Sequence, residues 1–281
     1  MEYRHLPPIT HYDKLIPKNF GKIGHLTGSK MIDSRDILLS PQEQEKYILK
    51  KRDVNDIVII TEKIDGMNAG AIKKNGLVYP INRKGYDTRL MGSGSHPELK
   101  ELGESWAAWV DDQYELLDFL LEEGERLVFE NAIYQHALRY RFHKSAVFLL
   151  AKFDDYNQRI DFHSLCELGE KYNLQTPPLL NYGAAIPPDI IIRQYPSGMA
   201  GSRDGIEGIV YYYEHNGKHE SCAKFVSNPK LGEPKGFTGV PNQVRKENIP
   251  GLLEKSNFQF RCANPCPEKI KKELYEKIRK I

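Results

Sequence analysis

The chain has 281 residues, of which 40% are hydrophobic and 28% are charged, and its mean hydropathy is -0.56. These values exclude a fibrous or disordered chain and predict a soluble globular protein with one large domain or two small ones. Forty Lys and Arg residues stand against 38 Asp and Glu, so the formal charge is only +2 and any nucleic-acid surface must be a local patch.

The sequence shows neither a targeting segment nor a disulfide pattern. No apolar run reaches the roughly 20 residues that a membrane-spanning helix needs. The N-terminal residues lack a basic segment followed by an apolar stretch, so we expect a cytoplasmic protein without a secretory signal or a membrane partner. Four cysteines are too few and too scattered for a disulfide framework. The spacing in RCANPCPEK supports a zinc site only weakly, and two reduced cysteines in a turn are the favoured interpretation.

Residues 1–50 are predicted to form loops and short elements packed on the core, including GKIGHLTGSK and a helix start at PQEQEKYILK. DIVIITEKID is rich in β-branched residues and predicts a strand that ends near Lys63. MNAGAIKK and LVYPINRKG flank the turn KNG and predict a hairpin. Together these runs predict an antiparallel meander with Lys63 at its head.

The strongest helical pattern is PELKELGESWAAWVDDQYELLDFLLEEGE, where apolar residues recur at three- and four-residue intervals. Its two tryptophans are predicted to belong to the core. Further strands are predicted at RLVFEN, AVFLLAKF, GIVYYYE and SCAKFV, and a further helix at HSLCELGEKYN. Because strands and helices interleave without a regular βαβ period, residues 51–240 are predicted to form an α+β domain of antiparallel sheets flanked by helices.

Residues 241–281 are predicted to form a short, mostly helical C-terminal extension. The last segment, PEKIKKELYEKIRKI, has the apolar spacing of an amphipathic helix and carries many lysines. Two interpretations remain open. The helix could dock by its apolar stripe with a solvated basic face, or its lysines could contact phosphates.

A set of charged and aromatic residues follows the lysine at the end of the predicted strand. The run Lys63-Ile-Asp-Gly66 is followed by Arg83 in NRKG, Glu130 in VFEN, Phe153 in AKFDDY, Glu207 in EGIV and Lys224 in CAKF. Each residue alone has an ordinary explanation as a turn cap, a core ring or an ion pair. Their joint order resembles the nucleotidyltransferase motifs of ATP-dependent polynucleotide ligases and RNA-capping enzymes. GHLTGSK and ENAIYQHALRY narrow the resemblance to the RNA ligase family of bacteria and their viruses.

The resemblance implies a nucleotidyltransferase (adenylation) domain in which Lys63 attacks ATP and carries AMP as a phosphoramidate. An ordinary lysine, with a pKa of about 10.4, must first lose its proton, which nearby positive charge would favour. The implied cofactors are ATP and Mg²⁺ (or Mn²⁺), with Glu207 as a catalytic residue and the metal ligand. Lys224 would neutralise the α-phosphate.

The resemblance also implies which residues hold the nucleotide. Glu130 would accept a hydrogen bond from a ribose hydroxyl, and Phe153 would stack on adenine. Arg83 would contact the ribose or the acceptor 5′-phosphate. Glu62, directly before Lys63, and Asp65, two residues after it, are also expected to contact the nucleotide.

One position departs from the family pattern. Cys222 stands where the last motif often has a first lysine, two residues before Lys224. Lys230 is a candidate to replace that lysine, and Arg203 is a candidate contact for the nucleic acid. Both also have an ordinary interpretation as surface residues.

The polymer is predicted from the length of the tail. A chain of 281 residues leaves 57 after Lys224, which is short for a complete five-stranded OB barrel. This favours an RNA ligase that recognises RNA with a 5′-phosphate and a 3′-hydroxyl. The alternatives are a DNA ligase, a capping-type guanylyltransferase, or an inactive fold that serves as an RNA-binding module. The protein partner expected for such a ligase is an end-healing kinase or phosphatase.

Overall fold

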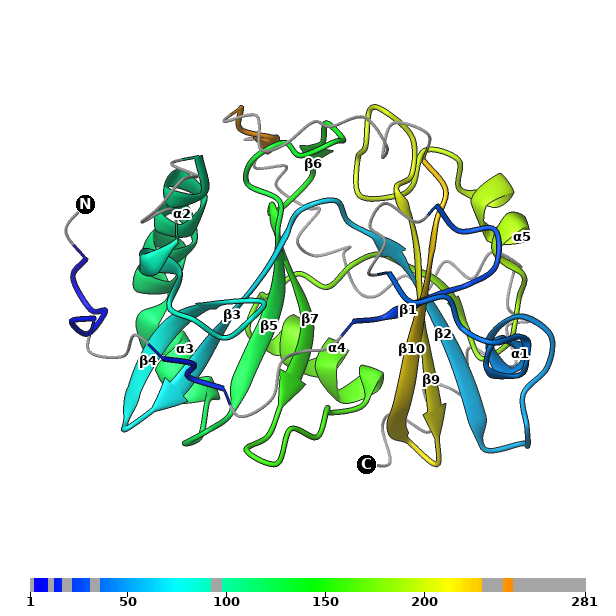
Figure 1. The fold of residues 1–281 in the computed structure, drawn as a ribbon, viewed down its shortest axis with the longest axis horizontal. Helices are drawn as coiled ribbons and strands as arrows, with labels where there is room; N and C mark the ends of the chain where they lie inside the picture. Colours follow the sequence, from blue (N-terminus) through cyan, green and yellow to red (C-terminus); the bar gives the residue numbers. More distant parts are fainter. Residues whose placement is uncertain are drawn as a thin grey trace.

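The computed structural model describes residues 3–9, 13–16, 22–30, 36–91, 98–228 and 240–244. These residues form a five-stranded sheet with the order β1-β10-β9-β2-β8 and a four-stranded sheet with the order β4-β3-β5-β7. Helices pack on both sheets (Figure 1). The predicted α+β fold class is therefore confirmed.

The five-stranded sheet consists of β1 (Gly24–His25), β2 (Asp56–Lys63), β8 (Leu179–Tyr182), β9 (Gly208–His215) and β10 (Lys218–Val226). β2 runs antiparallel to β9, so that Lys63 lies opposite Gly208. β9 runs antiparallel to β10, with Val210 opposite Lys224. The short β1 pairs in parallel with β10. A part of residues 1–50 thus belongs to the same sheet as the motif residues.

The four-stranded sheet consists of β3 (Met67–Lys74), β4 (Leu77–Asn82), β5 (Arg126–Asn131) and β7 (Val147–Phe153). The hairpin from β3 to β4 is present, and its turn residues Asn75 and Gly76 have φ angles of 53° and 71°. Asn and Gly tolerate this left-handed conformation, which suits a tight hairpin.

The predicted meander is wrong at its first step. β2 pairs with β8 and β9, whereas β3 pairs with β4 and β5. The segment after Lys63 therefore carries the chain from one sheet to the other (Figure 1). Periodicity identified both strands, but the choice of partner is made by residues far away in the sequence. As a result, Lys63 stands at the junction of the two sheets.

The helices are α1 (Pro41–Ile48), α2 (Glu98–Asp112), α3 (Tyr114–Leu120), α4 (Phe162–Lys171) and α5 (Pro188–Gln194), with a 3-10 turn η1 at Thr88–Leu90. The start of α1 is a capping box, in which Ser40 and Glu43 each accept a hydrogen bond from the other's backbone N–H group. The long predicted helix is divided into α2 and α3 at Gln113, whose backbone is not helical. α5 arises in a proline-rich passage, with a proline in its first turn.

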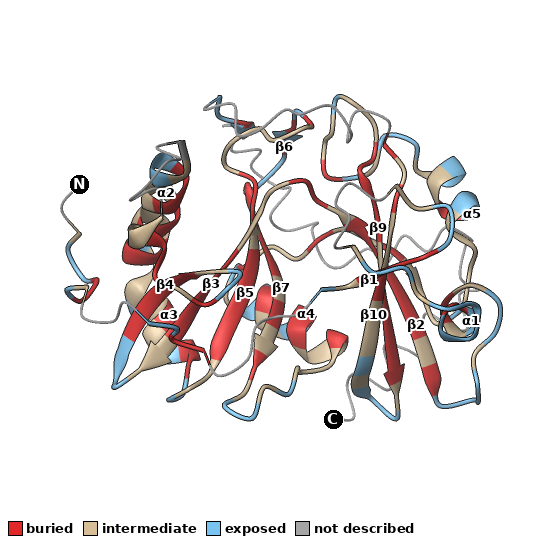
Figure 2. Cartoon of the chain, in the orientation of Figure 1, coloured by how far each residue is buried: buried red, intermediate tan, exposed pale blue. Residues whose placement is uncertain are grey.

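The core lies on the central strands of both sheets and the helices that cover them (Figure 2). Trp106 is fully buried and donates its ring N–H to the carbonyl oxygen of Gly70 at 2.8 Å. Trp109 stacks on it with ring centroids 4.8 Å apart. Both tryptophans thus belong to the core, as predicted. No helix among the described residues is long and apolar enough to cross a membrane.

Two short strands, β6 (Arg141–Phe142) and β11 (Gln243–Val244), form a parallel pair at the top of the view in Figure 1. The start of the predicted helical extension 241–281 is therefore a strand. Residues 245–281, Lys230 and the RCANPCPEK cysteines lie outside the described residues. The described cysteines, Cys166 and Cys222, are free thiols.

Candidate active site

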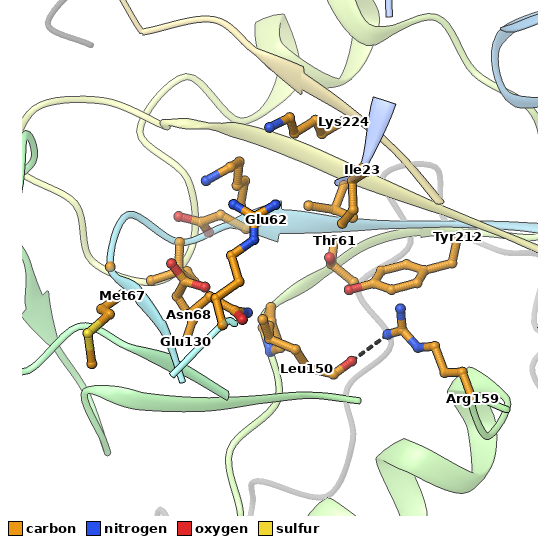
Figure 3. Close-up of a pocket in the computed structure, with 16 residues that line it drawn as sticks. Ile23, Thr61, Glu62, Met67, Asn68, Glu130, Leu150, Arg159, Tyr212 and Lys224 are labelled. Carbon is orange, nitrogen blue, oxygen red and sulfur yellow. Dashed lines mark hydrogen bonds between the residues drawn. The ribbon is translucent and has the colours of Figure 1, made fainter. Parts of the chain in front are cut away.

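A cavity of about 350 Å³ is lined by residues from both sheets, at the point where the chain crosses between them. Its lining comes from β2, β9 and β10 on one side and from β3, β5 and β7 on the other. Five of the residues predicted for the nucleotide site line it: Glu62, Lys63, Arg83, Glu130 and Lys224 (Figure 3). The two sheets thus bring together residues that are up to about 160 positions apart in the sequence.

Lys63 ends β2 with its side chain 24% exposed, and its Nζ atom donates a hydrogen bond to Oε1 of Glu207 at 2.6 Å. Burial acts to lower the pKa of Lys63, but the carboxylates of Glu207, Glu130 and Asp65 outweigh it and raise that pKa above its ordinary value. These carboxylates therefore favour the protonated form of Lys63. A bound cation that neutralises their charge would favour the neutral amine, which is the nucleophile.

Glu207 and Glu130 are the two acids whose negative charges do most to raise the pKa of Lys63. Burial raises the pKa of each carboxyl to about 7, and the positive charge of Lys63 opposes this rise in both. Glu207 has one oxygen in the ion pair with Lys63, while its other oxygen, Oε2, is buried and has no hydrogen-bond partner among the described residues. A buried carboxylate oxygen without a partner is costly unless a ligand satisfies it.

The cavity fits a divalent cation of the magnesium type. Glu207 is not among the lining residues, but it pairs with the cavity residue Lys63 and has an unpartnered oxygen, and Glu130 lines the cavity. Carboxylate oxygens are the ligands that Mg²⁺ prefers. In the described part of the chain, the one group of three ligand atoms within 4.8 Å of each other is Asp53, Asp56 and His215, at the other end of β2 and β9. The cavity acids therefore do not form a closed cage, which suits Mg²⁺ held by one or two carboxylates together with substrate phosphates.

Three cations line the same cavity. Arg83 follows β4, Lys224 lies on β10, and both line the cavity with Lys63. Burial and the nearby charge of Lys63 lower the pKa of Lys224, and Arg83 adds to this effect. Positive charge concentrated in a partly buried site favours an anionic ligand such as a phosphate.

The cavity also has an apolar lining beside hydrogen-bonding groups. Its apolar lining residues are Ile23, Ile64, Met67, Leu150, Pro177 and Val210. Figure 3 shows Thr61, Tyr212 and Arg159 gathered on one side of the cavity, away from Met67. The cavity therefore offers apolar surface together with charged groups, as a planar apolar group joined to phosphates requires.

Asp65 has backbone partners. Its Oδ2 atom accepts hydrogen bonds from the N–H groups of Ala137 at 2.8 Å and Leu138 at 2.7 Å. Its own N–H group donates to the hydroxyl of Tyr140 at 3.1 Å. Asp65 does not line the cavity, so the structure places it as a brace between the motif and residues 137–140.

Glu62 is a second brace. Its Oε2 atom accepts hydrogen bonds from the N–H groups of Met199 and Ala200, the latter at 2.9 Å. Burial raises the pKa of this carboxyl to about 7. Although Glu62 borders the cavity, its hydrogen bonds hold the segment that precedes β9.

Phe153 is the predicted residue that the structure separates from the others. Its ring is buried against Val128 and Ala151, with the guanidinium of Arg126 4.3 Å from the ring centroid. Phe153 does not line the cavity, so stacking on adenine does not fit this placement. Phe153 lies opposite Arg126, four residues along β5 from the cavity residue Glu130. A bulge in β7 lies between these two positions. Val128 pairs with Ala151 and Phe129 with Leu149, so Leu150 is the extra residue, and it lines the cavity instead.

Arg159 is a cavity residue that the sequence did not reveal. One of its Nη atoms donates to Sγ of Cys222 at 3.3 Å and the other to the carbonyl oxygen of Leu150 (Figure 3). Its guanidinium lies 4.6 Å from the centroid of the Tyr212 ring. A cation thus stands beside Cys222, the position where the family often has a lysine. Arg203 lies elsewhere, where it donates to Oε1 of Gln243 at 3.0 Å.

Solved structures with a similar fold include ligases for both polymers. An archaeal ATP-dependent RNA ligase is 15% identical with a TM-score of 0.44, and the match covers 75% of this chain and 48% of that one. A putative ATP-dependent DNA ligase from Aquifex aeolicus is 16% identical with a TM-score of 0.42, covering 74% and 50%. A Naegleria gruberi RNA ligase variant solved with ATP and Mn is 16% identical with a TM-score of 0.46, covering 78% and 61%. The present chain therefore spans about half to three fifths of the length of these proteins.

Sequence comparison identifies the family. The comparison with curated proteins found no match. The family model described as RNA ligase matches residues 56–226. This match covers more than half of the chain and extends from β2, which carries Lys63, to the end of β10, which carries Lys224. The chain thus belongs to the RNA ligase family.

Proposed function

We propose that the chain is an ATP-dependent RNA ligase that joins an RNA 5′-phosphate to a 3′-hydroxyl through a covalent lysyl-AMP. The observation that carries the proposal is the position of Lys63. Its side chain lines a cavity of about 350 Å³ together with Lys224 and Arg83, and its amine is paired with Glu207. An amine held among carboxylates and cations at this place is suited to attack phosphorus.

In the first step, the ammonium of Lys63 loses one proton to solvent, and the neutral amine attacks the α-phosphorus of ATP and releases a second proton as the phosphoramidate forms. A P–N bond forms, the P–O bond to the β-phosphate breaks, and pyrophosphate leaves. Lys224 and Arg83 would offset the charge that develops on the phosphate oxygens. A divalent cation held by Glu207, with Glu130 close to it, would supply further positive charge at the phosphates.

The nucleoside would lie along the cavity toward β7. Glu130 lines the cavity beside Asn68 and can accept a hydrogen bond from a ribose hydroxyl. Leu150 and Val210 offer apolar surface to the base, in place of the ring of Phe153. Arg159 carries only hydrogen-bond donors, so its partners on adenine would be ring nitrogens.

Two further transfers complete the reaction. The 5′-phosphate of the RNA attacks the phosphorus of lysyl-AMP, the P–N bond breaks, and an RNA-adenylate forms. The 3′-hydroxyl then attacks the 5′-phosphate, a phosphodiester forms, and AMP leaves. The two adenylated intermediates divide one difficult condensation into steps, and each step has a good leaving group.

Sealing assays on nicked duplexes test the proposal against its alternatives. We expect ATP and a divalent cation to support sealing of an RNA strand with a 5′-phosphate, and we expect GTP not to support it. Lys63→Ala protein should seal nothing while retaining its fold. Sealing of DNA strands alone would indicate a DNA ligase, and labelling by GTP a capping-type enzyme. RNA binding without any covalent AMP would indicate an inactive binding module.

A further inference from the structure

A small basic surface lies beside the candidate active site. Residues 139–143 run in extended form between two neighbouring segments. On one side, Arg141 N–H donates to the carbonyl oxygen of Gly201, and Arg203 N–H donates to that of Arg139, both at 2.9 Å. On the other side, β11 pairs with β6, and Gln243 N–H donates to the carbonyl oxygen of Tyr140 at 3.1 Å. We call these three segments, residues 139–143, 201–203 and 243–244, the basic ribbon.

The two faces of the basic ribbon differ sharply in polarity. Along its central segment, Tyr140 and Phe142 are buried in an apolar cluster. Side chains alternate across an extended strand, so the residues between them point to the opposite face. The exposed residues of the ribbon that carry positive charge or can acquire it are Arg139, Arg141, His143 and Arg203. Three guanidinium groups therefore share one short, solvent-facing surface.

Acidic residues neutralise this surface only in part. Arg139 forms a two-point ion pair with Asp204, with Nη2 2.6 Å from Oδ1 and Nε 3.0 Å from Oδ2. Among the residues that the structure describes, no acid forms an ion pair with Arg141 or Arg203. The ribbon thus supplies the local positive patch that a nucleic-acid ligand needs on a chain with a formal charge of only +2.

The ribbon is fastened to the nucleophile's motif. Asp65 accepts hydrogen bonds from Leu138 N–H and donates its own N–H to Tyr140, which lies within the ribbon. Glu62 accepts from Ala200 N–H, immediately before the second segment. Both braces are within two residues of Lys63 in the sequence. The backbone that carries these arginines is consequently fastened to the backbone that carries the reacting lysine.

From this arrangement we infer that Arg141 and Arg203, with Arg139, form the docking surface for the RNA backbone next to the break. The inference rests on the proposed function, because that function places the broken ends of the RNA at Lys63. Guanidinium groups bind phosphates with two parallel hydrogen bonds. Exposed positions two residues apart on a strand are about 7 Å apart, which lets successive arginines contact successive parts of an extended backbone.

The test is a double variant, Arg141→Ala with Arg203→Ala, in two assays. In the first, covalent labelling by ATP alone should match wild type, because neither arginine lines the nucleotide cavity. In the second, binding of a fluorescent nicked RNA duplex without ATP should weaken about thirtyfold at 0.15 M salt. The slope of log K against log salt should become flatter by about 1.8, as expected for two lost phosphate contacts. The Arg141→Lys, Arg203→Lys variant should retain most of the binding.

A matched control removes two positive charges elsewhere. Lys100 on α2 and Arg193 on α5 are exposed and each pairs with an acid four residues away. Lys100→Ala with Arg193→Ala should leave RNA binding near the wild-type value.

Two outcomes of the binding assay would overturn the inference. The first is that the Arg141→Ala, Arg203→Ala variant binds RNA with the affinity and the salt slope of wild type, which would favour an acidic protein partner. An equal loss in the control variant would overturn it as well. Absence of labelling in wild type would refute the proposed function but leave the binding test valid.

Discussion

The Glu207→Gln variant is expected to lose covalent transfer of AMP to the protein by a factor of at least about a hundred, with its fold retained. The change removes the negative charge that pairs with Lys63 Nζ at 2.6 Å. It also removes an anionic oxygen from the proposed cation, since Oε2 is the buried atom without a partner in the described structure. The amide has the same shape, so packing around β9 should be preserved. Gel labelling by ATP carrying a radioactive α-phosphate measures the effect.

The matched control is Glu214→Gln. Glu214 is also buried on β9, burial also raises the pKa of its carboxyl to about 7, and it accepts a hydrogen bond from Phe162 N–H. It lies seven residues from Glu207, near the other end of the strand. We expect this variant to be labelled as well as wild type. If Glu207→Gln were labelled at the wild-type rate, Glu207 would have neither the metal role nor the pairing role.

The second large effect is expected on stability. Asp65→Ala should lower the free energy of unfolding by about 3 to 4 kcal/mol, because two N–H groups lose charge-assisted hydrogen bonds to its carboxylate. For a chain of this size, that corresponds to a fall in Tm of about 6 to 12 °C. Asp65→Asn keeps one carbonyl oxygen and should lose less. Thermal unfolding measured by circular dichroism gives both values.

This experiment also separates two roles for Asp65. The family resemblance implies a place at the nucleotide, whereas the structure shows a brace between the motif and residues 137–140. A Tm like wild type together with lost labelling would contradict the bracing role and support direct contact with the nucleotide. A suitable reference is Asp161→Ala, which removes the N-cap hydrogen bond of α4 to Ser164 N–H and should cost only about 1 kcal/mol.

Local sequence patterns predicted much of the fold. The β-branched run before Lys63 became β2, the KNG turn became the hairpin of β3 and β4, and the apolar spacing around Trp106 became α2. Five predicted site residues line one cavity because the order of motifs along the chain reflects a fixed arrangement of strands. Family membership, rather than periodicity, carried that part of the prediction.

Features that depend on strand partners were not predicted. The step from β2 into a different sheet depends on pairing with β9, about 150 residues away. Leu150 lines the cavity as the extra residue of a bulge in β7, and no composition signal marks this bulge. Arg159 reaches Cys222 only through the packing of the two sheets. The alternation in residues 138–143 is visible in the sequence, but its neighbours at 201–203 and 243–244 are not.

Labelling of the protein with ATP shows whether AMP becomes bonded to Lys63. Wild type and Lys63→Ala are each incubated with a divalent cation and ATP labelled on either the α- or the γ-phosphate, then denatured and separated by electrophoresis. Wild type should retain the α-label and lose the γ-label, because pyrophosphate leaves when the P–N bond forms. Lys63→Ala should retain neither. Absence of α-label on wild type, or equal α-label on Lys63→Ala, would contradict a bond between AMP and Lys63.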